Sequence, residues 1–210
     1  MKKLTNLVIL DASSSMSRKA DEVRDGLKSL LKDIRKDMKE NKGKAKITTI
    51  VTQFSTAGKF KVLLNTSKRK EVTYDSVELY YPSGMTALFD AIGESFDLVG
   101  KKQDGVFVNI LTDGDENDSK KYSVEDVKGL FSEAEDSNWG VTFMGTTKDA
   151  VESAKSWGIK AGNTMQYSND VMGTRSANNT RLKSKQMYFA TAMNSTDMSN
   201  VNTDNLVDDE

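Results

Sequence analysis

The chain has 210 residues, of which 37% are hydrophobic and 29% are charged, a balance typical of one soluble globular domain. Lys and Arg total 30 and Asp and Glu total 31, so the formal net charge of -1 gives no overall field to attract nucleic acid or an anionic membrane. Cysteine and histidine are absent, which excludes disulfides, thiolate nucleophiles, the usual zinc sites and imidazole-dependent triads. Any bound metal must therefore use oxygen ligands.

The first half of the chain begins with a strand and a long helix. Residues 4–10 form an apolar run that is too short for a signal peptide or a membrane span, so we expect a buried strand there. Across residues 20–38, apolar side chains recur at three- and four-residue spacing, which predicts an amphipathic helix. Two more strands are expected at 47–54 and 59–64, the second as an antiparallel strand at the sheet edge.

The second half alternates helices and strands. Residues 106–111 are almost continuously apolar, as expected for a strand covered on both faces. Shorter strands are predicted at 141–144 and 164–167, and helical patterns cover residues 87–96, 124–134 and 149–157. This alternation predicts an α/β fold: a Rossmann-like, doubly wound, mostly parallel sheet with one antiparallel edge strand and helices on both faces.

The composition changes near the C-terminus, where Ser, Thr, Asn and Asp dominate. We expect one domain over residues 1–175, followed by a polar segment over 176–210. Residues 181–193 are expected to contribute a last helix, and residues 201–210 are expected to be disordered.

Polar clusters lie where strands give way to helices. Asp11-Ala12-Ser13-Ser14-Ser15 follows the first strand, Ser83-Gly84-Met85-Thr86 opens a helix, and Thr112-Asp113-Gly114 ends the buried strand. In a doubly wound sheet, ligands bind outside the carboxyl ends of the strands, where the strand order reverses. Acids and hydroxyls from separate loops are therefore expected to converge.

These clusters resemble the metal ion-dependent adhesion site (MIDAS) of the von Willebrand factor A (vWA) family. Asp11-x-Ser13-x-Ser15, Thr86 and Thr112-Asp113-Gly114 match its pattern in order. Residues 81–92 and 112–119 are also similar to small stand-alone bacterial and phage members, and the resemblance covers roughly residues 4–170. It implies the vWA fold and an open divalent-metal site.

The resemblance implies a role for each matching position. Ser13 and Ser15 would bind the metal through their hydroxyls, with Thr86 as a third hydroxyl, while Asp11 and Asp113 would hold metal-bound waters and orient the serines. A compact, hydroxyl-rich shell favours Mg²⁺, with Mn²⁺ or Ca²⁺ as alternatives. Neutral hydroxyls quench the charge of the ion poorly, so a carboxylate from a protein partner is a favourable further ligand.

Each cluster also has a simpler explanation. Ser13, Ser15 or Ser17 could cap the long helix, Thr86 could cap the next one, and Asp113-Gly114 is a common turn dipeptide. Caps alone do not require two acids at two strand ends, so the metal site is the preferred interpretation. Met16, beside the site, is expected to contribute to an apolar rim.

The leading hypothesis is a metal-dependent module that captures an Asp or Glu of a partner protein, and not an enzyme. One alternative is a metal-assisted phosphohydrolase, although Ser13 stands where haloacid dehalogenase-type enzymes carry a second Asp. Another is an assembly or host-interaction protein that works without metal. Nucleic acid and membrane are not expected as partners, and the absence of cysteine suggests a cytoplasmic setting.

Overall fold

The structure, a computed structural model, describes residues 1–100 and 102–207. Within this part of the chain, six strands form one sheet in the order β3-β2-β1-β4-β5-β6. β2 and β3 pair antiparallel, and every other neighbouring pair is parallel. The strands are β1 (Lys2–Asp11), β2 (Ala45–Phe54), β3 (Phe60–Thr66), β4 (Gly105–Leu111), β5 (Gly140–Gly145) and β6 (Thr164–Gln166).

The strand order reverses between β1 and β4. From β1 the chain builds outward through β2 and β3, then returns to place β4 on the other side of β1 and continues through β5 and β6. A crevice at the carboxyl ends of β1 and β4 is therefore the expected ligand position of such a sheet. The Rossmann-like, mostly parallel sheet with one antiparallel edge strand is confirmed.

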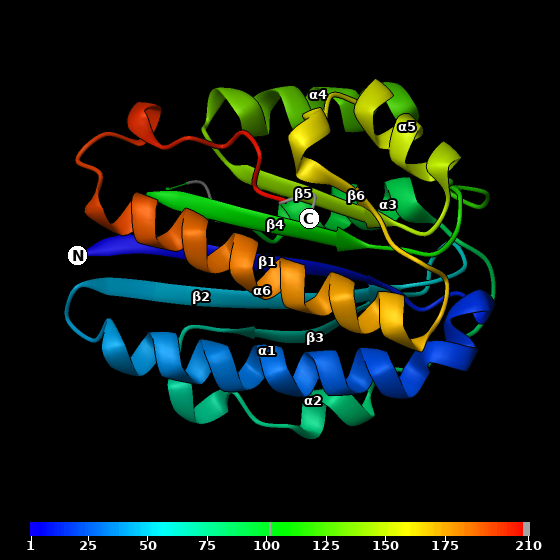
Figure 1. The fold of residues 1–210 in the computed structure, drawn as a ribbon, viewed down its shortest axis with the longest axis horizontal. Coiled ribbons are helices and arrows are strands. Elements are labelled where there is room, and N and C mark those ends of the chain that lie inside the picture. Colours follow the sequence, from blue (N-terminus) through cyan, green and yellow to red (C-terminus); the bar gives the residue numbers. More distant parts are fainter. Residues whose placement is uncertain (101, 208–210) are drawn as a thin grey trace.

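Helices cover both faces of the sheet (Figure 1). One face carries α1 and α6, with the short α2 beside α1, and the other carries α3, α4 and α5. None of the described helices combines the length and apolarity needed to cross a membrane. The helices are α1 (Ala20–Glu40), α2 (Asp75–Glu78), α3 (Leu88–Asp97), α4 (Val124–Asp136), α5 (Lys148–Ser156) and α6 (Val171–Asn194).

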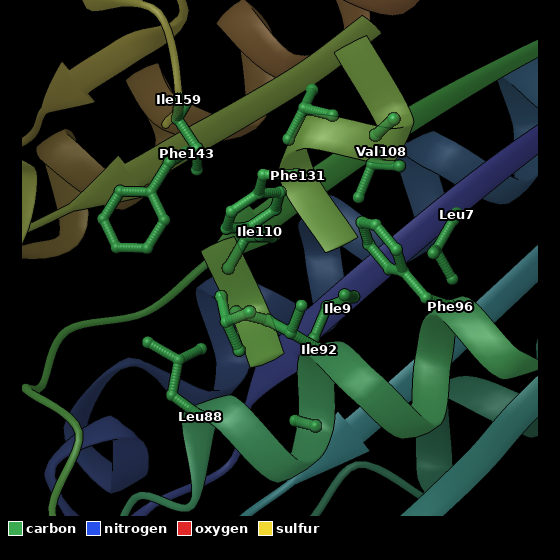
Figure 2. Packing of buried hydrophobic residues seen from close by; sticks show 14 of the residues in the cluster. Leu7, Ile9, Leu88, Ile92, Phe96, Val108, Ile110, Phe131, Phe143 and Ile159 are labelled. Atoms are coloured by element: carbon green, nitrogen blue, oxygen red, sulfur yellow. The ribbon is translucent and has the colours of Figure 1, made fainter. Parts of the chain in front are cut away.

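Strand β1 contributes to the core on both faces because its side chains alternate. Leu7 and Ile9 pack with α3 and α4 (Figure 2), whereas Val8 and Leu10 pack beneath α1. All four side chains are fully buried. This explains why the strand lacks the alternation of polar and apolar residues seen in strands with one solvated face.

The C-terminal segment differs from the expectation of disorder. Helix α6 begins at Val171 and therefore runs across the expected boundary after residue 175. Beyond it, Val201, Leu206 and Val207 are buried, and the Leu206 N–H donates to Asn163 Oδ1 at 2.9 Å. A few buried apolar side chains and backbone hydrogen bonds hold this polar segment, up to residue 207. The expectation for residues 208–210 lies outside the described residues.

Candidate metal centre

Backbone hydrogen bonds join two loops at the carboxyl end of β1, on the right-hand side of Figure 1. The Ser14 N–H donates to the Gly84 carbonyl at 3.0 Å, and the Ser83 N–H donates to the Ala12 carbonyl at 2.7 Å. Gly84 has a φ of +81°, and a Cβ there would approach Thr56 Oγ1 to 2.2 Å, so only glycine fits. The backbone thus holds residues 11–15 against residues 83–86.

Asp11 lies at the bottom of the site and is completely buried. Its Oδ1 accepts a hydrogen bond from the Ser13 N–H at 2.6 Å, and its Oδ2 accepts one from the Thr112 hydroxyl at 2.5 Å. Burial raises the pKa of the Asp11 carboxyl above its ordinary value of 3.8, although both hydrogen-bond partners lower it. A nearby cation would stabilise this carboxylate, because the protein alone does not fully compensate for its lost hydration.

Ser13, Ser15 and Asp113 form a continuous chain of polar contacts. The two serine hydroxyl oxygens are 3.0 Å apart, and the Ser15 hydroxyl donates to Asp113 Oδ1 at 2.5 Å. The other oxygen of Asp113 accepts from the Lys19 ammonium at 2.5 Å. The structure therefore brings the acid after β4 to the serines after β1, and it adds a buried lysine that the sequence analysis did not single out.

Thr86 reaches the same place from the loop before α3. Its hydroxyl oxygen is 3.2 Å from the position that a Cβ on Gly114 would take, so it adjoins the loop that carries Asp113. Asn117 fixes the Thr86 backbone, donating from its N–H to the Thr86 carbonyl and accepting the Thr86 N–H at its Oδ1. Within the described residues, the hydroxyl of Thr86 has no hydrogen-bond partner, so it is free to bind a ligand.

Two buried tyrosines support the strand ends below the site. The Tyr80 hydroxyl donates to the Asp11 carbonyl at 2.6 Å, and the Tyr167 hydroxyl donates to the Thr112 carbonyl at 3.1 Å. Burial, with a smaller contribution from the negative charges of the site acids, raises the pKa of both hydroxyls. Both therefore remain neutral donors. Neither position carries a sequence signal for this role, because each contact joins distant parts of the chain.

The acids that follow Asp113 organise the loop over α3. Glu116 accepts from the Phe89 N–H at 2.9 Å and from the Ser119 N–H at 2.7 Å. Asp118 accepts the Ala57 N–H at 2.8 Å. These carboxylates therefore have a structural role, because they accept backbone hydrogen bonds that fix the loop.

The assembled side chains fit a hard divalent cation. Ser13, Ser15 and Thr86 offer hydroxyl oxygens, Asp11 and Asp113 offer carboxylates, and oxygen ligands of this kind suit Mg²⁺. Among the described residues, no cluster of three or more acids could hold a metal, so the hydroxyls would have to contribute ligands. Lys19 does not belong to a metal-ligand set, because its ammonium is itself a cation.

The structure does not support the capping alternative for the serines, and it corrects the expectation for Met16. Ser13 precedes a 3₁₀ turn at Ser14–Lys19, and neither that turn nor α1 has a side-chain hydrogen bond at its N-cap, so helix capping does not explain the serines. Met16 is fully buried beneath the site and forms no rim. The reason is that the 3₁₀ turn directs Met16 inward, whereas Tyr81 and Met85 in the neighbouring loop are exposed.

Comparison with known families gives a match to the von Willebrand factor type A domain over residues 7–170. Curated protein sequences give no match.

Solved structures share the fold at low identity. A mussel byssus protein, proximal thread matrix protein 1 with a zinc-occupied MIDAS motif, has 14% identity and a TM-score of 0.65, over 87% of this chain and 48% of that one. This chain therefore spans about half the length of the mussel protein. The vWF domain of the type V pili tip protein Mfa5 from Porphyromonas gingivalis has 9% identity and a TM-score of 0.60, with 85% and 94% covered. The SpRpn10 VWA domain has 11% identity and a TM-score of 0.59, with 85% and 95% covered.

Proposed function

The chain belongs to the von Willebrand factor type A domain family, and from this premise we propose that it is a divalent-metal-dependent protein-binding module. The observation that carries the proposal is the meeting of two acids and three hydroxyls from separate loops at the reversal point of the sheet. The partner would present an Asp or Glu carboxylate to the metal.

Asp11, Ser13, Ser15, Thr86 and Asp113 would hold the ion, for which Mg²⁺ is the first candidate and Mn²⁺ or Ca²⁺ the alternatives. The ion would supply a positive charge and an open coordination position for a carboxylate oxygen. Ser15 is solvent-exposed although Asp11 beneath it is buried, so the site opens outward. This exposure supports a ligand that arrives from another molecule.

The proposal assigns no catalytic step to the chain. The Asp11 carboxylate is engaged by Ser13 and Thr112, and the chain has no histidine or cysteine to serve as a general base or nucleophile. The near-neutral net charge favours a protein partner over nucleic acid, and the absence of cysteine fits a cytoplasmic setting.

A metal-independent interaction protein is the second candidate. The Lys19 ammonium already contacts the Asp113 carboxylate, so the loops have an internal cation that can hold them together. Partner binding that persists in a chelator would favour this candidate over the first.

The first test measures the thermodynamic effect of Mg²⁺ on folding. At a Mg²⁺ concentration about 100 times its Kd, the free energy of unfolding should rise by about 3 kcal/mol, because the ion binds only the folded site. Asp11→Asn should lose this gain while keeping an acceptor for the Ser13 N–H. Asp136→Asn, on the exposed surface of α4, is the matched control and should respond like the parent.

The binding step is tested by protein capture from lysate in Mg²⁺ and in EDTA, using the parent and Asp11→Asn. We expect capture only by the parent in Mg²⁺. Equal stabilisation of the parent and Asp11→Asn by the ion, or none in either, would refute the metal site.

A further inference from the structure

A lysine side chain is built into the metal centre. Lys19 is only 3% exposed, although it lies in the 3₁₀ turn directly after the serines. Its ammonium donates to Asp113 Oδ2 at 2.5 Å and to Asn169 Oδ1, in the loop that leads to α6. The cation is thus held between a candidate metal ligand and a neutral amide oxygen.

Both oxygens of the Asp113 carboxylate accept hydrogen bonds in this arrangement. Oδ1 accepts from the Ser15 hydroxyl and Oδ2 accepts from the Lys19 ammonium, and the carboxylate side chain has no exposed surface. A buried carboxylate without a compensating charge is costly, so Lys19 stabilises the loops when no other cation is present.

A divalent ion bound near Asp113 would meet this ammonium at close range. Like charges a few ångströms apart repel each other, and the burial of Lys19 and Asp113 limits the screening of this repulsion by water. Both cations would also interact with the same Asp113 carboxylate. We propose that the Lys19 ammonium and the divalent ion compete for Asp113. Lys19 thereby sets the metal affinity of the site and keeps its loops assembled without metal. This inference rests on the proposed function, because it concerns the same site.

The chain contains a matched control for this proposal. Lys19 and Lys185 are the buried lysines of the described part of the chain. The Lys185 ammonium pairs with Asp33 and Asp37, where α6 packs on α1, and makes no contact with the candidate ligands. Replacing Lys185 removes a buried charge of the same kind and leaves the metal centre untouched.

The test compares the parent with Lys19→Met and Lys185→Met. Mg²⁺ and Mn²⁺ affinities are measured by calorimetry, and thermal unfolding is measured in EDTA. Lys19→Met should bind the ions at least about tenfold more tightly than the parent, since close charge pairs commonly couple by that much or more. Its unfolding temperature in EDTA should be lower, with a larger rise on adding Mg²⁺. Lys185→Met should also unfold at a lower temperature but keep the parent affinity.

Lys19→Gln provides a second variant if Lys19→Met does not fold, because its amide group is a neutral hydrogen-bond donor on a side chain one atom shorter than that of lysine. The same gain in affinity for Mg²⁺ and Mn²⁺ is expected for Lys19→Gln. Unchanged or weaker ion binding by the folded Lys19 variant would refute the proposal that Lys19 competes with the ion. Binding by the variant but not by the parent would support the competition and refute metal binding by the natural chain. No binding by either would overturn both proposals.

Discussion

At the start of α6, Asp170 shows how one side chain can fix a helix terminus beside the site. Its Oδ1 accepts the Gly173 N–H at 2.7 Å, which satisfies a donor that the first turn of the helix leaves free. That bond, with a further one from the Ser168 hydroxyl, lowers the pKa of the Asp170 carboxyl below 3.8. The preceding residue, Asn169, holds the Lys19 ammonium, so the cap also positions a group of the metal centre.

We expect Asp170→Ala to lower the unfolding temperature at neutral pH by roughly 2–4 °C, as for a lost N-cap in a chain of this size. Because folding lowers the pKa of Asp170, its stabilisation is present above 3.8 and is lost as the pH falls through the lowered value. The difference between parent and variant, followed by circular dichroism from neutral to acidic pH, should therefore shrink on acidification. Asp170→Asn keeps the cap and should show a small difference at every pH.

At the scale of elements, the packing of α6 on α1 depends on a missing side chain. Gly26 lies in the second turn of α1, and a Cβ there would be 2.2 Å from Asn178 Nδ2 on α6. The Gly26 carbonyl accepts from Arg181 at 3.2 Å, and Arg181 is buried with its Nε unpartnered. A side chain at position 26 would have to displace the Asn178 amide, so the packing of the two helices favours glycine in α1 despite its poor helix propensity.

Gly26→Ala is expected to lower the free energy of unfolding by about 1–3 kcal/mol, because the new methyl group collides with Asn178. Gly129→Ala in α4 is the control, since a Cβ there meets nothing within 4 Å, and it should stabilise the protein by up to about 1 kcal/mol. Urea unfolding measures both. If the collision is the cause, adding Asn178→Ala should restore much of the loss; a double variant no better than Gly26→Ala would contradict this explanation.

At the scale of the whole molecule, the last described segment completes part of the core beside α6 and β4. Leu206 and Val201 pack with Phe107 of β4 and Tyr188 of α6. The Ser184 hydroxyl also donates to the Leu206 carbonyl at 2.6 Å. The segment is therefore part of the folded unit although it follows the last helix.

Leu206→Ala should reduce the free energy of unfolding by about 2–5 kcal/mol, as for other buried leucines. Asn200→Ala, an exposed position in the same segment, should change it by no more than about 0.5 kcal/mol. Denaturant titration of both variants checks the prediction. Equal, small effects would show that the segment does not contribute to the core in solution.

The sequence determined the features that depend on local pattern. The apolar spacing in residues 20–38 and the apolar run at 106–111 predicted α1 and β4, because burial imposes the period of each element on its own residues. The ordered motif positions also predicted that Asp11, Ser13, Ser15, Thr86 and Asp113 lie together, and in the structure they lie beside the carboxyl ends of the central strands β1 and β4. Their role as metal ligands stays a prediction.

Only the tertiary structure decided which polar residues outside the motif join the site and whether residues 201–207 pack against the core. Lys19 looks like an ordinary charge near a helix start, yet its partners are 94 and 150 residues away in the sequence. Residues 201–207 have a polar composition, and their few apolar side chains are buried only because the sheet and α6 provide a surface for them. Contacts between distant segments depend on the assembled sheet, so local periodicity carries no signal for them.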